Sequence, residues 1–143
     1  MVILDTNVIS EPLKPEGDPA VLNWLDLQEI DTLYLTTITV AELRFGIAAL
    51  PPGNRKRRFE EAFEHRILSL FEDRILPFDM ADTVAYARIR AKAKTSGKAI
   101  ATADGFIAAI AAQHGFAVAT RDTSPFEAAG IPVINPWKEL HAV

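Results

Sequence analysis

Four acidic residues have the types and positions needed for metal-dependent chemistry. Asp5 follows a short β-branched run almost as soon as the chain begins. Three more acids occupy similar junctions further on, and these are Glu42, Asp104 and Asp122. Carboxylate oxygens gathered at the carboxyl edge of a parallel sheet form a site for Mg²⁺ or Mn²⁺. Such an ion can orient a water molecule, lower the pKa of that water and stabilise charge on a phosphoryl oxygen. The sequence predicts this site if the four side chains meet in space.

Each acid also has a purely structural explanation. Asp5 can cap the helix that follows it, and Glu42 can complete a capping box with Thr39 as the N-cap. Asp104 falls in a first helical turn, where a negative charge favours the helix macrodipole by roughly 0.3–1 kcal/mol. Asp122 fits an ordinary turn. A cap needs no second acid nearby, whereas clustered carboxylates need a proton or a cation to offset their repulsion. If the four converge, a divalent cation is the simplest compensation.

The composition limits the kinds of site that are possible. The chain has 143 residues, of which 49% are apolar, and this suits one globular domain with a substantial core. It contains no cysteine, and its histidines lie far apart without ligand spacing; they are His65, His114 and His141. A zinc site is therefore disfavoured, and any metal needs oxygen ligands. The N-terminus lacks a signal-peptide pattern and no apolar run reaches membrane-spanning length, so we expect a cytoplasmic protein with no membrane partner.

Basic residues are gathered in two places although the net charge is −4. One run covers residues 55–58, and the second consists of Arg88, Arg90, Lys92, Lys94 and Lys98. A local basic surface can bind phosphate whatever the overall sign of the charge. The alternative is that both runs are solvated helix faces.

Short β-rich segments alternate with helical patterns along the chain. We expect strands at residues 2–4, 33–36, 116–119 and 132–134, with a weaker one at 75–78. We expect helices that begin at Asp18-Pro19, run from Thr39 to Leu50, from an Asn54 cap to about Phe71, from Asp79 to Gly97, and from Thr102 or Asp104 to Gln113, the last closed by His114-Gly115. This alternation predicts an α/β fold, a single domain over residues 1–143 with a central parallel sheet flanked by helices. The acids can then converge at one edge of the sheet.

Four ordered blocks of the sequence resemble the PIN-domain ribonucleases, and within them the toxins of VapBC-type toxin–antitoxin pairs, including the FitB-like branch. The blocks are 1–10 (MVILDTNVIS), 39–46 (TVAELRFG), 103–111 (ADGFIAAIA) and 118–122 (VATRD), followed by a frequent ending at 134–137 (INPW). The resemblance runs essentially end to end. A lone D-T-N is weak evidence, but four blocks in this order over a chain of this size are strong.

The resemblance implies a metal-dependent endoribonuclease with a single PIN-like domain. Its catalytic and metal-binding residues are identified as Asp5, Glu42, Asp104 and Asp122, which bind Mg²⁺ or Mn²⁺ and activate a water against an RNA phosphodiester. Thr6 and Thr120 are expected to support these acids through their hydroxyl groups. Arg121 is expected to contact phosphate or to form a surface salt bridge.

The fourth acid is where the chain departs from the pattern of the family. Members often have Asn at the position of Asp122 and place an acid a few residues later, where this chain has Pro125 and, beyond it, Glu127. The sequence analysis favours Asp122 as the functional acid and treats Glu127 as a loop residue.

The resemblance also implies partners. Members commonly form homodimers and bind a small antitoxin whose tail covers the acidic site, often with an Arg. An acidic pocket that receives a cationic tail agrees with electrostatic complementarity. Apolar residues at 8–9, Leu13, Trp24 and Phe45 are candidates for the antitoxin groove, although most of them are expected to belong to the core.

Two other functions remain open at this point. A haloacid-dehalogenase-like phosphatase also places a nucleophilic Asp after its first strand, but such enzymes usually carry another Asp two residues later, where this chain has Asn7. A non-catalytic PIN-like module that holds RNA or a partner is the second alternative, although the presence of all four acids argues against it.

Overall fold

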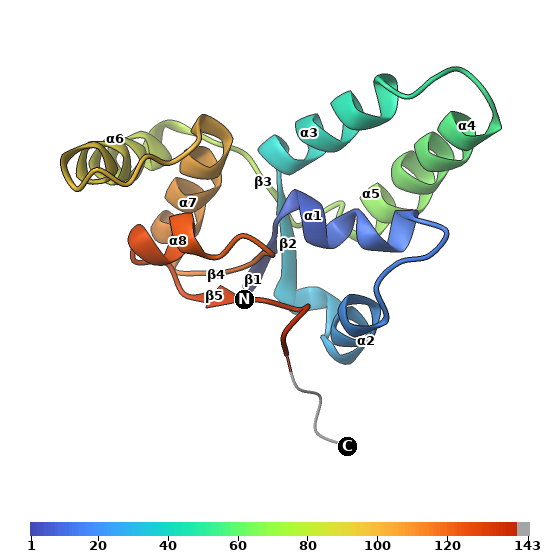
Figure 1. Cartoon of the computed structure of the whole chain (residues 1–143), viewed down its shortest axis with the longest axis horizontal. Coiled ribbons are helices and arrows are strands. Elements are labelled where there is room, and N and C mark those ends of the chain that lie inside the picture. Colours follow the sequence, from blue (N-terminus) through green and yellow to red (C-terminus); the bar gives the residue numbers. More distant parts are fainter. Residues whose placement is uncertain (140–143) are drawn as a thin grey trace.

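A five-stranded parallel sheet forms the centre of the molecule in the computed structural model, which describes residues 1–139. Its strands lie in the order β3-β2-β1-β4-β5, so the first strand of the chain is the central one (Figure 1). They are β1 (Val2–Leu4), β2 (Leu33–Thr36), β3 (Ile75–Leu76), β4 (Ala117–Ala119) and β5 (Val133–Ile134). The expected α/β fold with a parallel sheet is confirmed.

Helices cover both faces of the sheet, and the division follows the order of the sequence (Figure 1). The side chain of Leu4 packs with the helices that precede β3, whereas that of Ile3 packs with those that follow it. The first group consists of α1 (Thr6–Ile9), α2 (Pro19–Leu27), α3 (Thr37–Ala48), α4 (Asn54–Glu61) and α5 (Leu68–Leu70). The second consists of α6 (Met80–Thr95), α7 (Thr102–His114) and α8 (Ser124–Ala128). Adjacent residues of β1 thus belong to separate cores, because successive side chains of a β-strand point to opposite faces of the sheet.

Three short irregular helices complete the first layer. Two are 3₁₀ turns, η1 (Glu11–Leu13) and η2 (Ile30–Thr32), and the third is a π-helical segment, η3 (Ala62–Ile67). The segment η3 joins α4 to α5, so the long helix expected up to about Phe71 is present but contains a π-helical stretch. None of the helices within residues 1–139 is both long and apolar enough to cross a membrane.

Local sequence signals predicted several helix ends correctly. The Asp18 carboxylate accepts a hydrogen bond from the backbone N–H of Ala20, with Pro19 as the first helical residue. Asp79 caps α6 in a capping box with Asp82. At the end of α7, Gly115 adopts a left-handed conformation with φ of 70°, which suits glycine because it has no Cβ. Each of these signals acts within one turn of the chain.

Two predicted caps are wrong. Helix α3 begins at Thr37, not Thr39, and the hydroxyl of Thr36 accepts the capping bond from the N–H of Thr39 at 3.1 Å. The cap moves because strand β2 ends at Thr36 and passes into the helix without a loop. Asn54 is the first residue of α4 and does not cap it, because Gly53 occupies the N-cap position and the Asn54 amide oxygen accepts a bond from Arg57.

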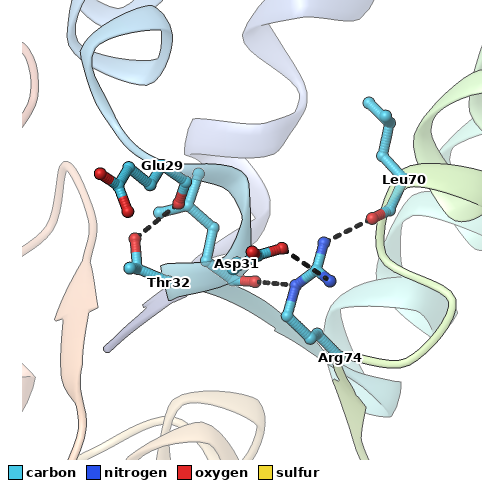
Figure 2. A network of polar contacts seen from close by, with 6 residues as sticks. Glu29, Asp31, Thr32, Leu70 and Arg74 are labelled. Carbon is cyan, nitrogen blue, oxygen red and sulfur yellow. Dashed lines mark hydrogen bonds and ion pairs between the residues drawn. The ribbon is translucent and has the colours of Figure 1, made fainter.

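The side chain of Arg74 ties the end of α5 to the start of β2 (Figure 2). Its Nε donates to the carbonyl oxygen of Leu33 at 3.0 Å, and its Nη2 donates to that of Leu70. Asp31 is 3.9 Å from Nη1 and supplies an opposite charge. The carbonyl of Arg74 accepts the N–H of Leu35 at 2.9 Å, which fixes the register of β2 and β3. This edge therefore places β2 and, directly after it, helix α3.

Arg74→Ala should lower the free energy of unfolding by about 2 kcal/mol, because the carbonyl group of the buried Leu33 loses its donor and α5 loses its link to β2. Chemical denaturation followed by circular dichroism measures this difference. Arg66→Ala is the matched control, since Arg66 is exposed on the neighbouring helical segment. Equal stability of the two variants would show that the Arg74 bonds do not hold this edge together.

Candidate functional site

The Asp5 carboxylate is the buried centre of the site. Asp5 directly follows β1, and its backbone N–H donates to the carbonyl of Ala119 at the end of β4 at 2.9 Å. One carboxylate oxygen accepts the N–H of Thr6, and the other accepts the hydroxyl of the fully buried Thr120, both at 2.8 Å. Asp5 therefore caps α1, as one explanation of the sequence expected, and also faces the edge where β1 and β4 end. From β1 the chain continues to β2 and β3 on one side of the sheet, whereas β4 and β5 lie on the other side of β1. The strand order therefore reverses between β1 and β4, and in parallel sheets a crevice forms at the carboxyl ends of the strands at such a switch point.

Glu42 reaches this edge from α3. The predicted capping box is wrong, because the Glu42 carboxylate does not bond to the start of its own helix. Instead it accepts the hydroxyl of Thr6 at 2.7 Å, across 36 residues of sequence. The bond connects α3 to the residue that follows Asp5. Thr6 thus lies between Asp5 and Glu42 and donates a hydrogen bond to each of them.

Asp104 lies in the first turn of α7, where aromatic packing holds the helix against α6. The ring of Phe106 stacks on Tyr86 of α6, with centroids 4.7 Å apart and planes 15° from parallel. Phe78, just before α6, packs edge-on against the Phe106 ring, with the two centroids 4.7 Å apart. Two aromatic contacts on one residue restrict how α7 can shift or rotate. They therefore fix the position of the neighbouring carboxylate.

Asp122 lies in the loop after β4 and, like Glu42, is exposed. Its N–H donates to the Thr120 hydroxyl at 3.2 Å, and the Ser124 hydroxyl is 3.5 Å from its carboxylate. Asn7 holds the same loop, because its side-chain oxygen accepts the N–H of Arg121 at 3.3 Å. This role of Asn7 could not be read from the sequence, since it depends on the loop arriving 114 residues later.

Neighbouring carboxylates affect the ionisation of two acids of the site, Asp5 and Asp104. Burial raises the pKa of Asp104 to about 6, with further contributions from the negative charges of Asp5, Asp122 and Glu42. Burial also raises the pKa of Asp5, while the hydrogen bonds from Thr120 and Thr6 lower it and the charges of Glu42 and Asp122 raise it. None of the causes that act on Asp5 and Asp104 is a positively charged side chain of residues 1–139, so the charged form of each carboxylate is disfavoured where it lies.

The donor set suits a hard divalent cation. All the polar groups are carboxylate or hydroxyl oxygens, which Mg²⁺ and Mn²⁺ prefer, and the raised pKa values show that positive charge would be favourable. Within residues 1–139, however, no three acidic or histidine side chains are already arranged as a group of metal ligands. Asp5 and Glu42 are turned toward threonine hydroxyls. A shared cation therefore requires the carboxylates to move toward one another.

Several other sequence predictions can be placed. The Arg121 guanidinium lies over the ring of Trp137 at 5.0 Å from the centroid and forms no ion pair among residues 1–139, so the expected salt bridge is absent there. Glu127 is part of α8, so its assignment to a loop is wrong. Of the apolar groove candidates, Val8, Ile9 and Trp24 are buried and Leu13 packs against the same core, whereas Phe45 is 75% exposed on α3.

The two basic runs and the histidines can also be placed. The first basic run forms the start of α4, where most of its side chains are exposed, as expected of a solvated helix face. The second lies on α6 and the loop after it. His65 belongs to η3 and His114 ends α7, while His141 lies outside the described residues.

Comparison with known proteins agrees with this geometry. The PIN domain family model matches residues 2–131. The VapC ribonuclease Y4jK of Sinorhizobium fredii is 59% identical over 138 residues, which cover 96% of this chain and 99% of that protein. The toxin FitB of Neisseria gonorrhoeae is 54% identical over 139 residues, which cover 97% of this chain and all of that protein.

Solved structures give the same result. FitAcB from Neisseria gonorrhoeae matches with a TM-score of 0.93 at 54% identity, over 97% of this chain and 100% of that one. VapBC2 from Rickettsia felis, bound to a DNA fragment from its promoter, matches with a TM-score of 0.78 over 94% and 98% of the two chains, and at 22% identity it shows a shared fold.

The chain belongs to the PIN domain family. Within that family its relatives at more than half identity over nearly their whole length include proteins named as a VapC ribonuclease and as toxin FitB. This membership excludes the haloacid-dehalogenase fold that the sequence analysis left open.

Asp104→Asn should stabilise the metal-free protein near neutral pH. The folded state holds the Asp104 proton up to about pH 6, whereas the ordinary pKa is 3.8, so ionisation lowers the free energy of unfolding progressively between these values. Asparagine removes that penalty. In EDTA, the melting temperature of the variant should exceed that of the wild type at about pH 7, and the difference should shrink toward about pH 4.

The exposed Asp26 on α2 offers a matched control, because Asp26→Asn changes the same charge away from the acid cluster. A lower melting temperature for Asp104→Asn than for wild type at neutral pH would mean that the carboxylate holds the fold together rather than straining it.

Proposed function

We propose that this protein is a metal-dependent endoribonuclease that acts as the toxin of a type II toxin–antitoxin pair. The observation that carries the proposal is the convergence of four acids from separate parts of the chain at the switch point of a PIN-family sheet. Clustered negative charge has no value for folding, because each carboxylate raises the cost of ionising its neighbours. It has a clear value if a divalent cation binds there.

The acids would hold Mg²⁺ or Mn²⁺ and thereby act on an RNA phosphodiester. The metal supplies a water of lowered pKa and stabilises charge on the phosphoryl oxygen. Asp5, Glu42 and Asp104 are the main ligands in this proposal, and Asp122, on its exposed loop, completes the set. The Thr120 hydroxyl donates to Asp5 and thereby favours its charged form against the effect of burial, and the Thr6 hydroxyl orients Glu42 by donating to it.

The proposed partners are RNA, a second copy of the chain and a small antitoxin. Two similar solved structures are FitAcB and FitAB, the latter bound to a DNA fragment. For this chain, an uncompensated acidic site suits a cationic side chain of an antitoxin. The exposed Phe45 lies three residues after Glu42 on α3 and is a suitable apolar contact beside that site. A toxin that cleaves cellular RNA would act in the cytoplasm.

Purified protein should cleave single-stranded RNA when Mg²⁺ or Mn²⁺ is present, and EDTA should abolish the cleavage. Asp5→Ala and Asp104→Asn should each reduce the rate by about 100-fold or more, because each removes a negatively charged ligand from the site. Gel electrophoresis of an end-labelled RNA measures the rate.

Asp26→Asn again serves as the control and should cleave like the wild type. Cleavage that survives both EDTA and Asp5→Ala would refute the proposal. RNA binding without any metal-dependent cleavage would favour a non-catalytic PIN-like module instead.

A further inference from the structure

Arg90 contacts the first turn of α7, the helix that carries Asp104, and the proposed reaction does not use it. It is half-buried on α6, and this helix packs beside α7 (Figure 1). Its Nη1 donates to the hydroxyl of Tyr86 at 2.9 Å and to that of Thr102 at 3.2 Å. Its Cζ is 5.6 Å from the centroid of the Tyr86 ring. The guanidinium group is therefore held in place by neutral partners.

The other edge of this guanidinium has no partner among residues 1–139. Both hydrogen bonds of Arg90 use Nη1, and neither Nε nor Nη2 donates to a group in that part of the chain. No ion pair in that part of the chain involves Arg90 either. The Nε and Nη2 edge is the pair of parallel donors with which arginine binds a carboxylate or a phosphate. A fixed arginine with this edge unpaired has the chemistry of an anion receptor.

The location of Arg90 connects it to the catalytic acids. Thr102, which accepts one of its bonds, is the first residue of α7, and Asp104 follows two residues later. Gly105 allows the close approach, because a Cβ there would lie 3.1 Å from Cδ of Arg90 and 3.2 Å from the Tyr86 ring. The arginine side chain thus crosses the first turn of the helix that carries Asp104.

Arg90 also borders a hollow of about 470 Å³. It lies between the second half of α6 and the loop over residues 96–101, and its border includes Lys94, Gly97 and Ile100. Arginine and lysine thus stand on the same hollow, with an apolar side chain between the helix and the loop. A nucleic-acid strand, with charged phosphates and flat apolar bases, matches this combination.

We propose that Arg90 binds a phosphate of the RNA strand next to the one that is cleaved, so that the strand runs from the acidic site into the hollow bordered by Arg90 and Lys94. This inference rests on the proposed ribonuclease function. The four carboxylates repel every phosphate near them, and a metal ion offsets that repulsion only at the scissile group. A flanking phosphate therefore gains most from a separate cation at the rim, and Arg90 provides one whose geometry is already fixed.

RNA binding without cleavage gives the first test. A fluorescent single-stranded RNA is titrated with wild type and Arg90→Gln in EDTA at several salt concentrations. Arg90→Gln should weaken binding roughly tenfold and reduce the dependence of log K on log salt concentration by about one phosphate contact. Arg88→Gln is the matched control, because Arg88 is exposed two residues earlier and on the opposite side of the same helix.

Steady-state cleavage separates binding of the strand from a structural role. Arg90→Gln should raise KM roughly tenfold while changing kcat by less than about threefold. Arg90→Lys should recover the salt dependence but only part of the affinity, because lysine keeps the charge and loses the paired donors. Thermal melting of each variant shows whether the α6–α7 contact has survived.

Different outcomes overturn different claims. Arg90→Gln and Arg88→Gln with equal RNA affinity would overturn the role of Arg90 while leaving the ribonuclease assignment intact. A lowered melting temperature with a fall in kcat and an unchanged KM would do the same, by showing that Arg90 only joins α6 to α7. A wild-type protein that neither binds nor cleaves RNA would overturn both proposals.

Discussion

The hydrogen bond between the Thr120 hydroxyl and the Asp5 carboxylate joins the central strand β1 to its neighbour β4 at the point where the site forms. Asp5 ends the central strand β1 and Thr120 follows β4, so one 2.8 Å contact fixes residues that are 115 positions apart in the sequence. Because Thr120 is fully buried, this donor has no competition from bulk water. The remaining acids are placed relative to this pair: Glu42 through Thr6, and Asp122 through the N–H that it donates to Thr120.

This arrangement gathers like charges, and the rest of the molecule has to tolerate them. The pKa of Asp104 is raised, because burial and three neighbouring carboxylates disfavour its charged form. The same feature explains why positive groups matter around the site. A metal ion can offset the charge at the centre, an antitoxin can cover it with a cationic side chain, and Arg90 can attract RNA at the rim. All three follow from one surplus of negative charge.

Local features of the fold could be predicted from the sequence, whereas long-range contacts could not. The caps at Asp18 and Asp79 depend on residues within one turn, and the strands follow from short apolar runs. Thr39 was mistaken for a cap because nothing local shows that β2 passes directly into α3. The sequence could single out the four acids because each lies just after a strand or in the first two turns of a helix, and their role in catalysis stays a prediction. For Glu42, the resemblance to the family favoured a role in the acidic site over a role as a helix cap. Its contact with Thr6 could not be predicted from the sequence. Arg90 looked like one member of a basic run, and only the packing of α6 on α7 distinguishes it.

Calorimetric titration of Mn²⁺ into the metal-free protein near pH 6 tests the central claim most directly. Repeating it in buffers of different ionisation enthalpy counts the protons that binding releases. Since the pKa of Asp104 is about 6 in the absence of metal, that carboxyl is partly protonated there, and metal binding should displace its proton. The account predicts binding with proton release in the wild type, and weaker binding with less release in Asp104→Asn. Binding that is absent, or that is equal in the two proteins with no release of protons, would contradict it.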